Sequence, residues 1–260
     1  MNYKLTSSQM NFCENIFLAS NENMWNLGGY ILFKKDCNYE KLNEALNKLI
    51  ENHEFIRMII KKSENGLVSH IENYRKTNQS FHRFKNIDEL KKYAFEYLTP
   101  LNLEDNLFNL SIFQLGDKFG YFSNIHHSVL DGYSMGVMAD FIVQYLDDAS
   151  VIKRHQSYQE YIDTYEKYKK SKRYIADKKF WLKQFSSNPR CSIFEAKKTS
   201  FNYASDEVDF RLSSELFDKI KAYCHNNKIS VQSFFNTVYS VHHGNEGQDI
   251  LLLFAVRLGI

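Results

Sequence analysis

The sequence has little proline, no closely spaced cysteines and no long apolar run, and each shortage excludes a class of protein. Two prolines and the lack of any Gly/Ser-rich stretch leave no recognisable flexible linker. The four cysteines show no CxxC spacing, so we expect reduced thiols rather than a disulfide framework or a metal site. The longest apolar run, over residues 250–256, is far too short to cross a bilayer, and the N-terminus lacks the apolar segment of a signal peptide. These shortages predict a cytoplasmic protein without a membrane partner.

An excess of charge of either sign is also lacking. The chain has 33 basic and 31 acidic residues, and this balance gives no sign of the basic stripe that nucleic-acid binding uses. Apolar residues make up 43% of the chain and aromatic residues 15%, so a sizeable core is available. We therefore expect a globular protein without a nucleic-acid partner.

The apolar pattern switches irregularly between helical and extended periods. In the region 38–52, Leu42, Ala45, Leu46, Leu49 and Ile50 form one helical stripe. The alternation of strands and helices lacks the regular order of a doubly wound sheet, which favours an α+β architecture. We predict helices at 38–52, 87–98, 134–145, 156–185, 214–226 and 230–242, with Ser134 and Ser213 as N-caps, and strands at 25–33, 55–60, 67–72, 108–115, 119–125, 202–212 and 249–256.

A polar segment beside the second proline is the best candidate for a domain boundary. Ser186, Ser187 and Asn188 precede Pro189, after the long charged helical region. We accordingly predict a first lobe over residues 1–185 and the beginning of a second over 186–260. The chain stops just after a strand that reads as buried, and we expect the second lobe to be incomplete.

The most informative feature is the segment His126-His127-Ser128-Val129-Leu130-Asp131-Gly132, between a predicted strand and a predicted helix. Successive side chains of a strand point to opposite faces, so one histidine should face a reaction space and the other pack inward. Histidine is the side chain best suited to move a proton near neutral pH. Asp131 could orient an imidazole or pair with a cation, and Gly132 would allow tight backbone geometry or close substrate approach.

The spacing alone leaves a plainer interpretation open, in which these histidines are ordinary polar residues at a strand end and Asp131-Gly132 is a turn. A metal site is disfavoured because no third ligand lies at a recognisable spacing. A serine hydrolase is disfavoured because no GxSxG elbow is present.

The segment resembles the HHxxxDG signature of nonribosomal peptide synthetase condensation domains, in the chloramphenicol acetyltransferase-like superfamily. The resemblance is collinear over nearly the whole chain, although the Arg and Trp often found after the N-terminal motif are absent here. After the HHxxxDG segment, Ser134-Met135-Gly136-Val137 favours condensation over epimerisation. The two histidines of the segment disfavour cyclisation. The other matching segments are Thr6-Ser7-Ser8-Gln9, His53-Glu54-Phe55-Ile56-Arg57, Phe180-Trp181 and Phe254-Ala255-Val256.

The resemblance implies a role for each residue of the site. His127 would be the catalytic residue that deprotonates or orients the acceptor amine. His126 would be structural, and Gly132 belongs to the same motif. Asp131 would form a buried ion pair with Arg57, so that Arg57→Ala should cost about 3–5 kcal/mol by stranding a buried carboxylate.

The resemblance also implies the fold and the partners. The fold would be a layered sandwich of the chloramphenicol acetyltransferase type, in which a mixed sheet is flanked by helices. The activity would be amide bond formation between a carrier-bound acyl donor and an aminoacyl acceptor. The chain itself would bind no cofactor or metal, because 4′-phosphopantetheine arrives on donor and acceptor carrier proteins, next to neighbouring synthetase domains. One alternative is a stand-alone acyltransferase. The other is a non-catalytic lobe that binds carrier proteins, which we consider because the family's members are nearly twice as long.

Overall fold

The computed structural model describes residues 2–18, 25–34, 36–64, 66–150, 157–186 and 210–243. The chain divides into two compact units, Met1–Asp177 and Lys178–Ile260, which we describe separately. The predicted strand at 249–256 and most of the predicted strand at 202–212 lie outside the described residues. No described helix is both long enough and apolar enough to span a membrane.

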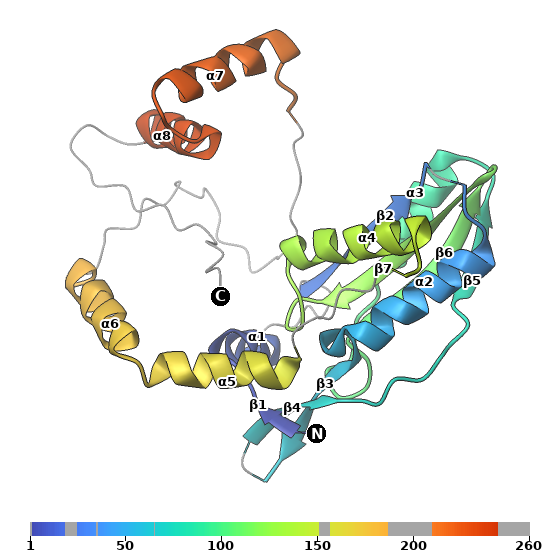
Figure 1. Ribbon diagram of the computed structural model, residues 1–260, viewed down its shortest axis with the longest axis horizontal. Coiled ribbons are helices and arrows are strands. Elements are labelled where there is room, and N and C mark those ends of the chain that lie inside the picture. The colour runs from blue at the N-terminus through green and yellow to red at the C-terminus, as the bar shows by residue number, and fades with distance from the viewer. Residues whose placement is uncertain are drawn as a thin grey trace. The chain divides into compact units, whose positions relative to one another are not determined.

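The centre of the first unit is a four-stranded mixed sheet with the order β2-β7-β6-β5 (Figure 1). Its strands are β2 (Asn26–Leu32), β5 (Ser80–Phe84), β6 (Phe108–Leu115) and β7 (Lys118–His126). β5 runs parallel to β6, whereas the other two pairs are antiparallel. The sheet is flanked by helices, which confirms the predicted α+β class.

β6 and β7 form a hairpin, and their bounds lie close to the strands predicted at 108–115 and 119–125. Gly116 has a φ of +61°, the left-handed conformation that a tight two-residue turn requires and that glycine adopts without strain. The turn sets the register so that Phe113 lies opposite Gly120. A Cβ atom at Gly120 would collide with the carbonyl oxygen of Ile31 and with the Phe113 ring. Because Gly120 has no side chain, the Phe113 ring of β6 can lie against the backbone of β7.

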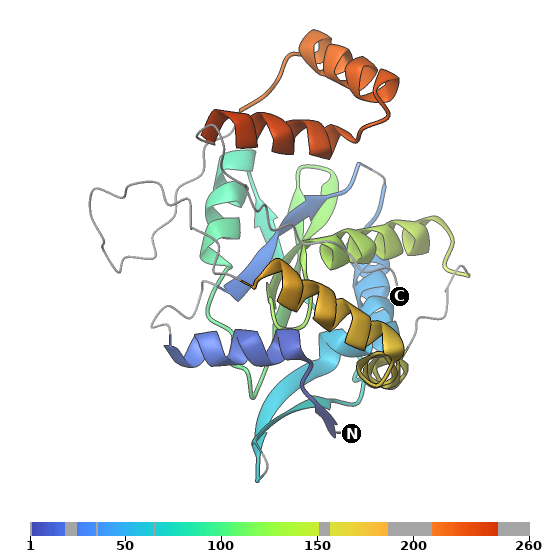
Figure 2. The same ribbon diagram turned by 90° about the vertical axis from the view of Figure 1, so that its left-hand side faces the viewer.

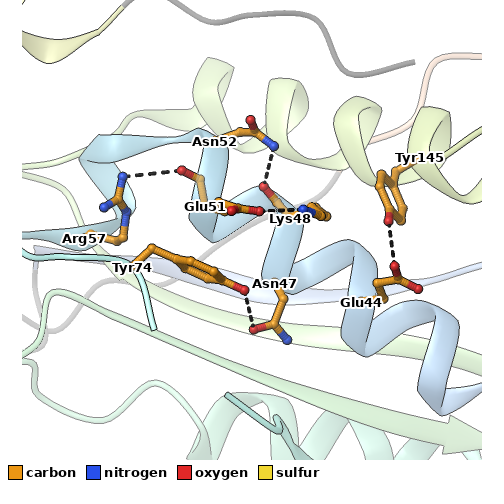
Figure 3. A network of polar contacts seen from close by, with 8 residues as sticks. All are labelled: Glu44, Asn47, Lys48, Glu51, Asn52, Arg57, Tyr74 and Tyr145. Carbon is orange, nitrogen blue, oxygen red and sulfur yellow. Dashed lines mark hydrogen bonds and ion pairs between the residues drawn. The ribbon is translucent and has the colours of Figure 1, made fainter. Parts of the chain in front are cut away.

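Helices α2 (Tyr39–Asn52) and α4 (Gly132–Asp147) cover one face of this sheet. They lie side by side in Figure 1, and the Tyr145 hydroxyl of α4 donates to Glu44 of α2 at 3.1 Å (Figure 3). The predicted stripe of α2 is fully buried: Leu42, Ala45, Leu46 and Leu49 are 0% exposed and Ile50 is 5% exposed. β6 and β7 contribute Leu110, Ile112, Tyr121 and Ile125 to the same core.

The opposite face of the sheet packs on helix α3 (Ile87–Glu96) through a smaller, aromatic cluster. Leu90 and Ala94 of the helix meet Phe113 and Phe122 of the strands. The rings of Phe113 and Phe122 are 4.6 Å apart between centroids. The alternation of side chains along β6 and β7 thus divides the strands between two cores.

A second sheet, with the order β1-β4-β3, is antiparallel throughout. Its strands are β1 (Asn2–Lys4), β3 (Met58–Ser63) and β4 (Gly66–Ile71). The predicted strand at 55–60 is wrong in its first half, because residues Glu54–Arg57 form a 3₁₀ turn and the strand begins at Met58. The turn lets the Arg57 side chain reach back to the end of α2, as described below.

The predicted long helix over 156–185 is two helices, α5 (Tyr158–Lys169) and α6 (Lys172–Gln184). Ser157 caps α5 in a capping box with Glu160. In the second unit, α7 (Ser214–Asn226) and α8 (Val231–His243) match the predicted helices to within one residue, and Ser213 caps α7 as predicted. Figure 2 gives a second view of these helices.

Candidate active site

The two adjacent histidines come at the end of β7, where the backbone leaves the sheet. The His126 N–H donates to the Leu107 carbonyl at 2.8 Å, and the His127 N–H donates to the Trp25 carbonyl at 2.7 Å. Both residues are therefore anchored through the backbone, each by a different neighbouring segment. A rigid strand end of this kind gives a catalytic side chain the support it needs.

His126 packs inward and is only 2% exposed. Its Nδ1 atom accepts the Ser128 N–H at 3.1 Å and lies 2.8 Å from the Ser128 hydroxyl oxygen. Burial, with a smaller contribution from the neighbouring His127, lowers the pKa of His126 to about 4. His126 is therefore neutral at pH 7 and suited to a structural role.

His127 is half-buried and lies in an aromatic environment. Its ring is stacked on Phe12 of helix α1 (Ser7–Leu18), with centroids 4.8 Å apart and planes 24° from parallel. The Nδ1 atom is buried and finds no hydrogen-bond partner among the described residues. The imidazole thus has one enclosed nitrogen and a ring held against an aromatic plane.

The N-cap of α4 is Asp131, so the prediction of Ser134 as the N-cap is wrong. Its backbone is extended, and its Oδ1 atom accepts the Ser134 N–H at 2.9 Å and the Ser134 hydroxyl at 2.7 Å. These two bonds lower the pKa of the Asp131 carboxyl, and the nearby charge of His127 adds a small effect. A carboxylate at this position also interacts favourably with the helix dipole.

The predicted buried ion pair between Asp131 and Arg57 is wrong. Asp131 is exposed, and the Arg57 guanidinium donates instead to three backbone carbonyls: Ile50 at 3.0 Å, Glu72 at 2.8 Å and Glu51 at 3.4 Å. Figure 3 shows Arg57 turned toward Glu51 at the end of α2. The last carbonyls of a helix lack intrahelical partners and carry partial negative charge, so they bind a guanidinium without a buried carboxylate.

Gly132 is the first residue of α4 and is exposed. Its φ is not in the left-handed region, and a Cβ atom at this position would meet no described atom within 4 Å. The tight backbone geometry expected at Gly132 is therefore not required here. The expected close approach of a substrate remains a prediction.

Gln9 and Glu54, in two of the matching segments, make contacts with helix α5 that the sequence did not predict. The Oε1 atom of Gln9 accepts the Thr6 N–H at 3.0 Å and the Tyr158 hydroxyl at 3.0 Å. A carboxylate oxygen of Glu54 accepts the Tyr158 N–H at 2.7 Å. These bonds tie the starts of α1 and α5 to the turn after α2. The Thr-x-x-Gln spacing of a capping box was the available signal for the first of them.

Metal ligands do not gather in the described part of the chain, where no group of three or more His, Cys, Asp or Glu residues could hold an ion. Cys13 and Cys224 are buried thiols, and Cys37 is half-buried.

Comparison with known proteins matches this chain to one family. The family model described as "Condensation domain" matches residues 1–245. Surfactin synthase subunit 1 of Bacillus subtilis is 25% identical over 261 residues, which cover 92% of this chain and 7% of that protein. Bacitracin synthase 1 of Bacillus licheniformis is 25% identical over 206 residues, which cover 74% of this chain and 4% of that protein.

Solved structures share the fold. The condensation domain from the monacolin K polyketide synthase MokA matches with a TM-score of 0.78 at 15% identity, over 94% of this chain and 59% of that one. The first condensation domain of the CDA synthetase matches with a TM-score of 0.60 at 19% identity, over 73% of this chain and 51% of that one. These likenesses confirm the predicted layered fold. The chain spans a little more than half the length of these two solved domains and a small part of the synthases.

Proposed function

The chain belongs to the condensation-domain family, and from that membership we propose that it supplies the histidine-bearing half of a domain that forms amide bonds between carrier-bound substrates. The observation that supports this proposal best is the position of His127. Its backbone is anchored at the end of β7, and its half-buried side chain stacks on Phe12 of α1. A proton acceptor in such a place is both rigid and reachable.

The reaction requires one bond to form and one to break. The acceptor amine attacks the thioester carbonyl of the donor, so that a C–N bond forms and the C–S bond breaks. His127 accepts or orients the proton that the amine loses, and the departing thiolate ends as a thiol on the donor's 4′-phosphopantetheine arm. The arms belong to the carrier proteins, so the chain itself needs to hold no cofactor.

The other motif residues support the site rather than the reacting atoms. His126 stays neutral in the interior and is bonded to Ser128, which stabilises the loop. Asp131 caps α4, and Gly132 keeps the start of that helix free of a side chain where an acyl arm would pass. Arg57 secures the end of α2.

The test is product formation with a donor and an acceptor loaded on separate carrier proteins. Because the chain spans about half of the solved domains, it is assayed together with the complementary half of a condensation domain. We expect His127→Ala to lower the rate of amide formation by about 10²–10⁴-fold. His225→Ala, at an exposed position on α7, is the matched control and should leave the rate unchanged. Equal rates for His127→Ala and the parent would reject the catalytic role.

A second candidate function is a non-catalytic lobe that binds carrier proteins. The same assay separates the two candidates. A lobe that only binds would retain loaded carriers on an affinity column, whereas no amide product would appear by mass spectrometry. Product that depends on His127 would exclude this candidate.

A further inference from the structure

Two aromatic residues outside the seven-residue motif lie in a row with His127. Phe12 comes from α1, and Trp25 directly precedes β2. The Phe12 ring stacks on the imidazole at 4.8 Å and meets the Trp25 ring edge-on, with centroids 5.2 Å apart and planes 80° from parallel. The three side chains therefore form a continuous aromatic row with Phe12 in the middle.

Backbone pairing holds the two ends of this row together. Asn26 lies opposite His126 in the pairing of β2 with β7, and the next bond along joins the His127 N–H to the Trp25 carbonyl at 2.7 Å. The positions of Trp25 and His127 are thus set by the sheet, whereas Phe12 arrives from a helix. Because a stacked ring restricts the rotation of the imidazole, the row can hold the proton-accepting atom in one direction.

The row contains two polar atoms that remain unbonded. The Nε1 atom of Trp25 and the Nδ1 atom of His127 are buried and find no hydrogen-bond partner among the described residues. Buried indole N–H groups nearly always donate to an acceptor, so an unpaired one in the same aromatic row as His127 needs an explanation. An indole N–H is a donor only, and the group that satisfies it must therefore bring an acceptor atom.

Building on the proposed function, we propose that Phe12 and Trp25 form an aromatic clamp that orients the His127 imidazole, and that the Trp25 indole N–H binds the carbonyl oxygen of the acyl thioester. Phe12 is then a positioning residue, and Trp25 is a substrate-binding residue. A thioester carbonyl fits because it offers only an acceptor. It also gains negative charge when the amine attacks, which strengthens its bond to a fixed donor.

The positioning role is tested by NMR of the His127 ring in the 260-residue chain, without any substrate. Phe12→Leu keeps the apolar bulk and removes the aromatic plane, whereas Phe12→Tyr keeps the plane. We expect the His127 ring signals to shift and broaden in Phe12→Leu and to return toward the parent positions in Phe12→Tyr. Amide signals of the main sheet serve as the check that both variants fold. Ring signals that are the same in Phe12→Leu as in the parent would overturn the clamp.

The binding role is tested with S-octanoyl pantetheine as the probe. The chain has two tryptophans, Trp25 and Trp181, so its indole N–H signals are readily assigned with Trp25→Phe. We expect the probe to move the Trp25 indole proton to lower field, as a new hydrogen bond does, and to leave the Trp181 signal in place. A Trp25 signal that stays in place, whether or not other residues respond, would overturn the donor role.

These measurements test the clamp independently of the proposed reaction. The ring and indole signals report the clamp and the bound carbonyl even where no amide forms. A chain that shows both responses but gives no His127-dependent product would retain the clamp and lose the condensation activity. A chain that makes product without either response would retain the activity and lose the clamp.

Discussion

Helices α2 and α7 have similar apolar spacing in the sequence but different surroundings in the structure. The stripe of α2 is buried against the main sheet, whereas α7 buries only Ile220 and Cys224. On α7, Leu216 remains 46% exposed and Tyr223 54% exposed. An amphipathic pattern therefore predicts a helix, but the sheet beneath it determines how much stability the apolar face contributes.

The sharpest test of this comparison replaces one leucine in each helix. Leu46→Ala removes a side chain that is 0% exposed, and we expect a loss of about 2–5 kcal/mol in the free energy of unfolding. Leu216→Ala removes one that is 46% exposed, and the expected loss is about 1 kcal/mol or less. Denaturant unfolding of both variants, with hydrogen exchange to report each helix, measures the difference. Equal losses would mean that α7 has a core of its own.

Acid should destabilise the first unit through His126. Because burial lowers the pKa of His126 to about 4, the unfolded chain binds a proton there between about pH 6.5 and pH 4 and the folded chain does not. Stability is therefore retained above pH 6.5 and lost as the pH falls. We expect His126 to account for about 2 kcal/mol of the loss between pH 7 and pH 5. Denaturant unfolding of the His126→Asn variant at pH 7 and pH 5 measures this effect. The variant should lose about 2 kcal/mol less stability between the two pH values than the parent.

The Arg57 side chain tests what secures the end of α2. Arg57→Ala removes donors to three backbone carbonyls, and we expect a loss of about 1–2 kcal/mol rather than the larger cost of a stranded buried carboxylate. Arg75→Ala, at an exposed position nearby, is the matched control and should change stability little. A loss of 3–5 kcal/mol, as first expected, would restore the ion pair with Asp131.

The two helix caps give the smallest contrast. Asp131 caps α4 in the first unit, and Ser213 caps α7 in the second. We expect each replacement by Ala to cost about 1 kcal/mol locally, because each cap satisfies the amide of the residue three positions on. Hydrogen exchange of the first turn of each helix reports the effect. A cost at Asp131 several times that at Ser213 would show that the motif carboxylate has a further partner.

Much of the fold could be predicted because its signals are local. The stripe of α2 and the neighbouring strands β6 and β7 depend on residues close together in the chain, and they form where the sequence indicates. The strand expected at 55–60 failed in its first half for the opposite reason. There, the Arg57 side chain bonds to the distant Glu72 carbonyl and to the end of α2, and no local pattern shows this.

The site divides in the same way. That His126 and His127 follow a strand is readable from the sequence, and their different burial follows from the side-chain alternation of a strand. The N-cap was misplaced at Ser134 because Asp131 and Ser134 are both good capping residues, and only the backbone angles decide between them. Phe12 and Trp25 were missed because neither is near the motif in the chain.

The sequence by itself therefore determined the class of fold, most of the helices and the histidine motif, because these depend on periodicity and on residues that are close in the chain. Only the tertiary structure decided that Arg57 binds the end of α2, that Gln9 joins α1 to α5, and that Phe12 stacks on His127. These contacts join segments that the folding of two sheets brings together. Which side chains pair depends on which carbonyl groups and aromatic rings come close together in the folded chain. The sequence alone does not show these spatial neighbours.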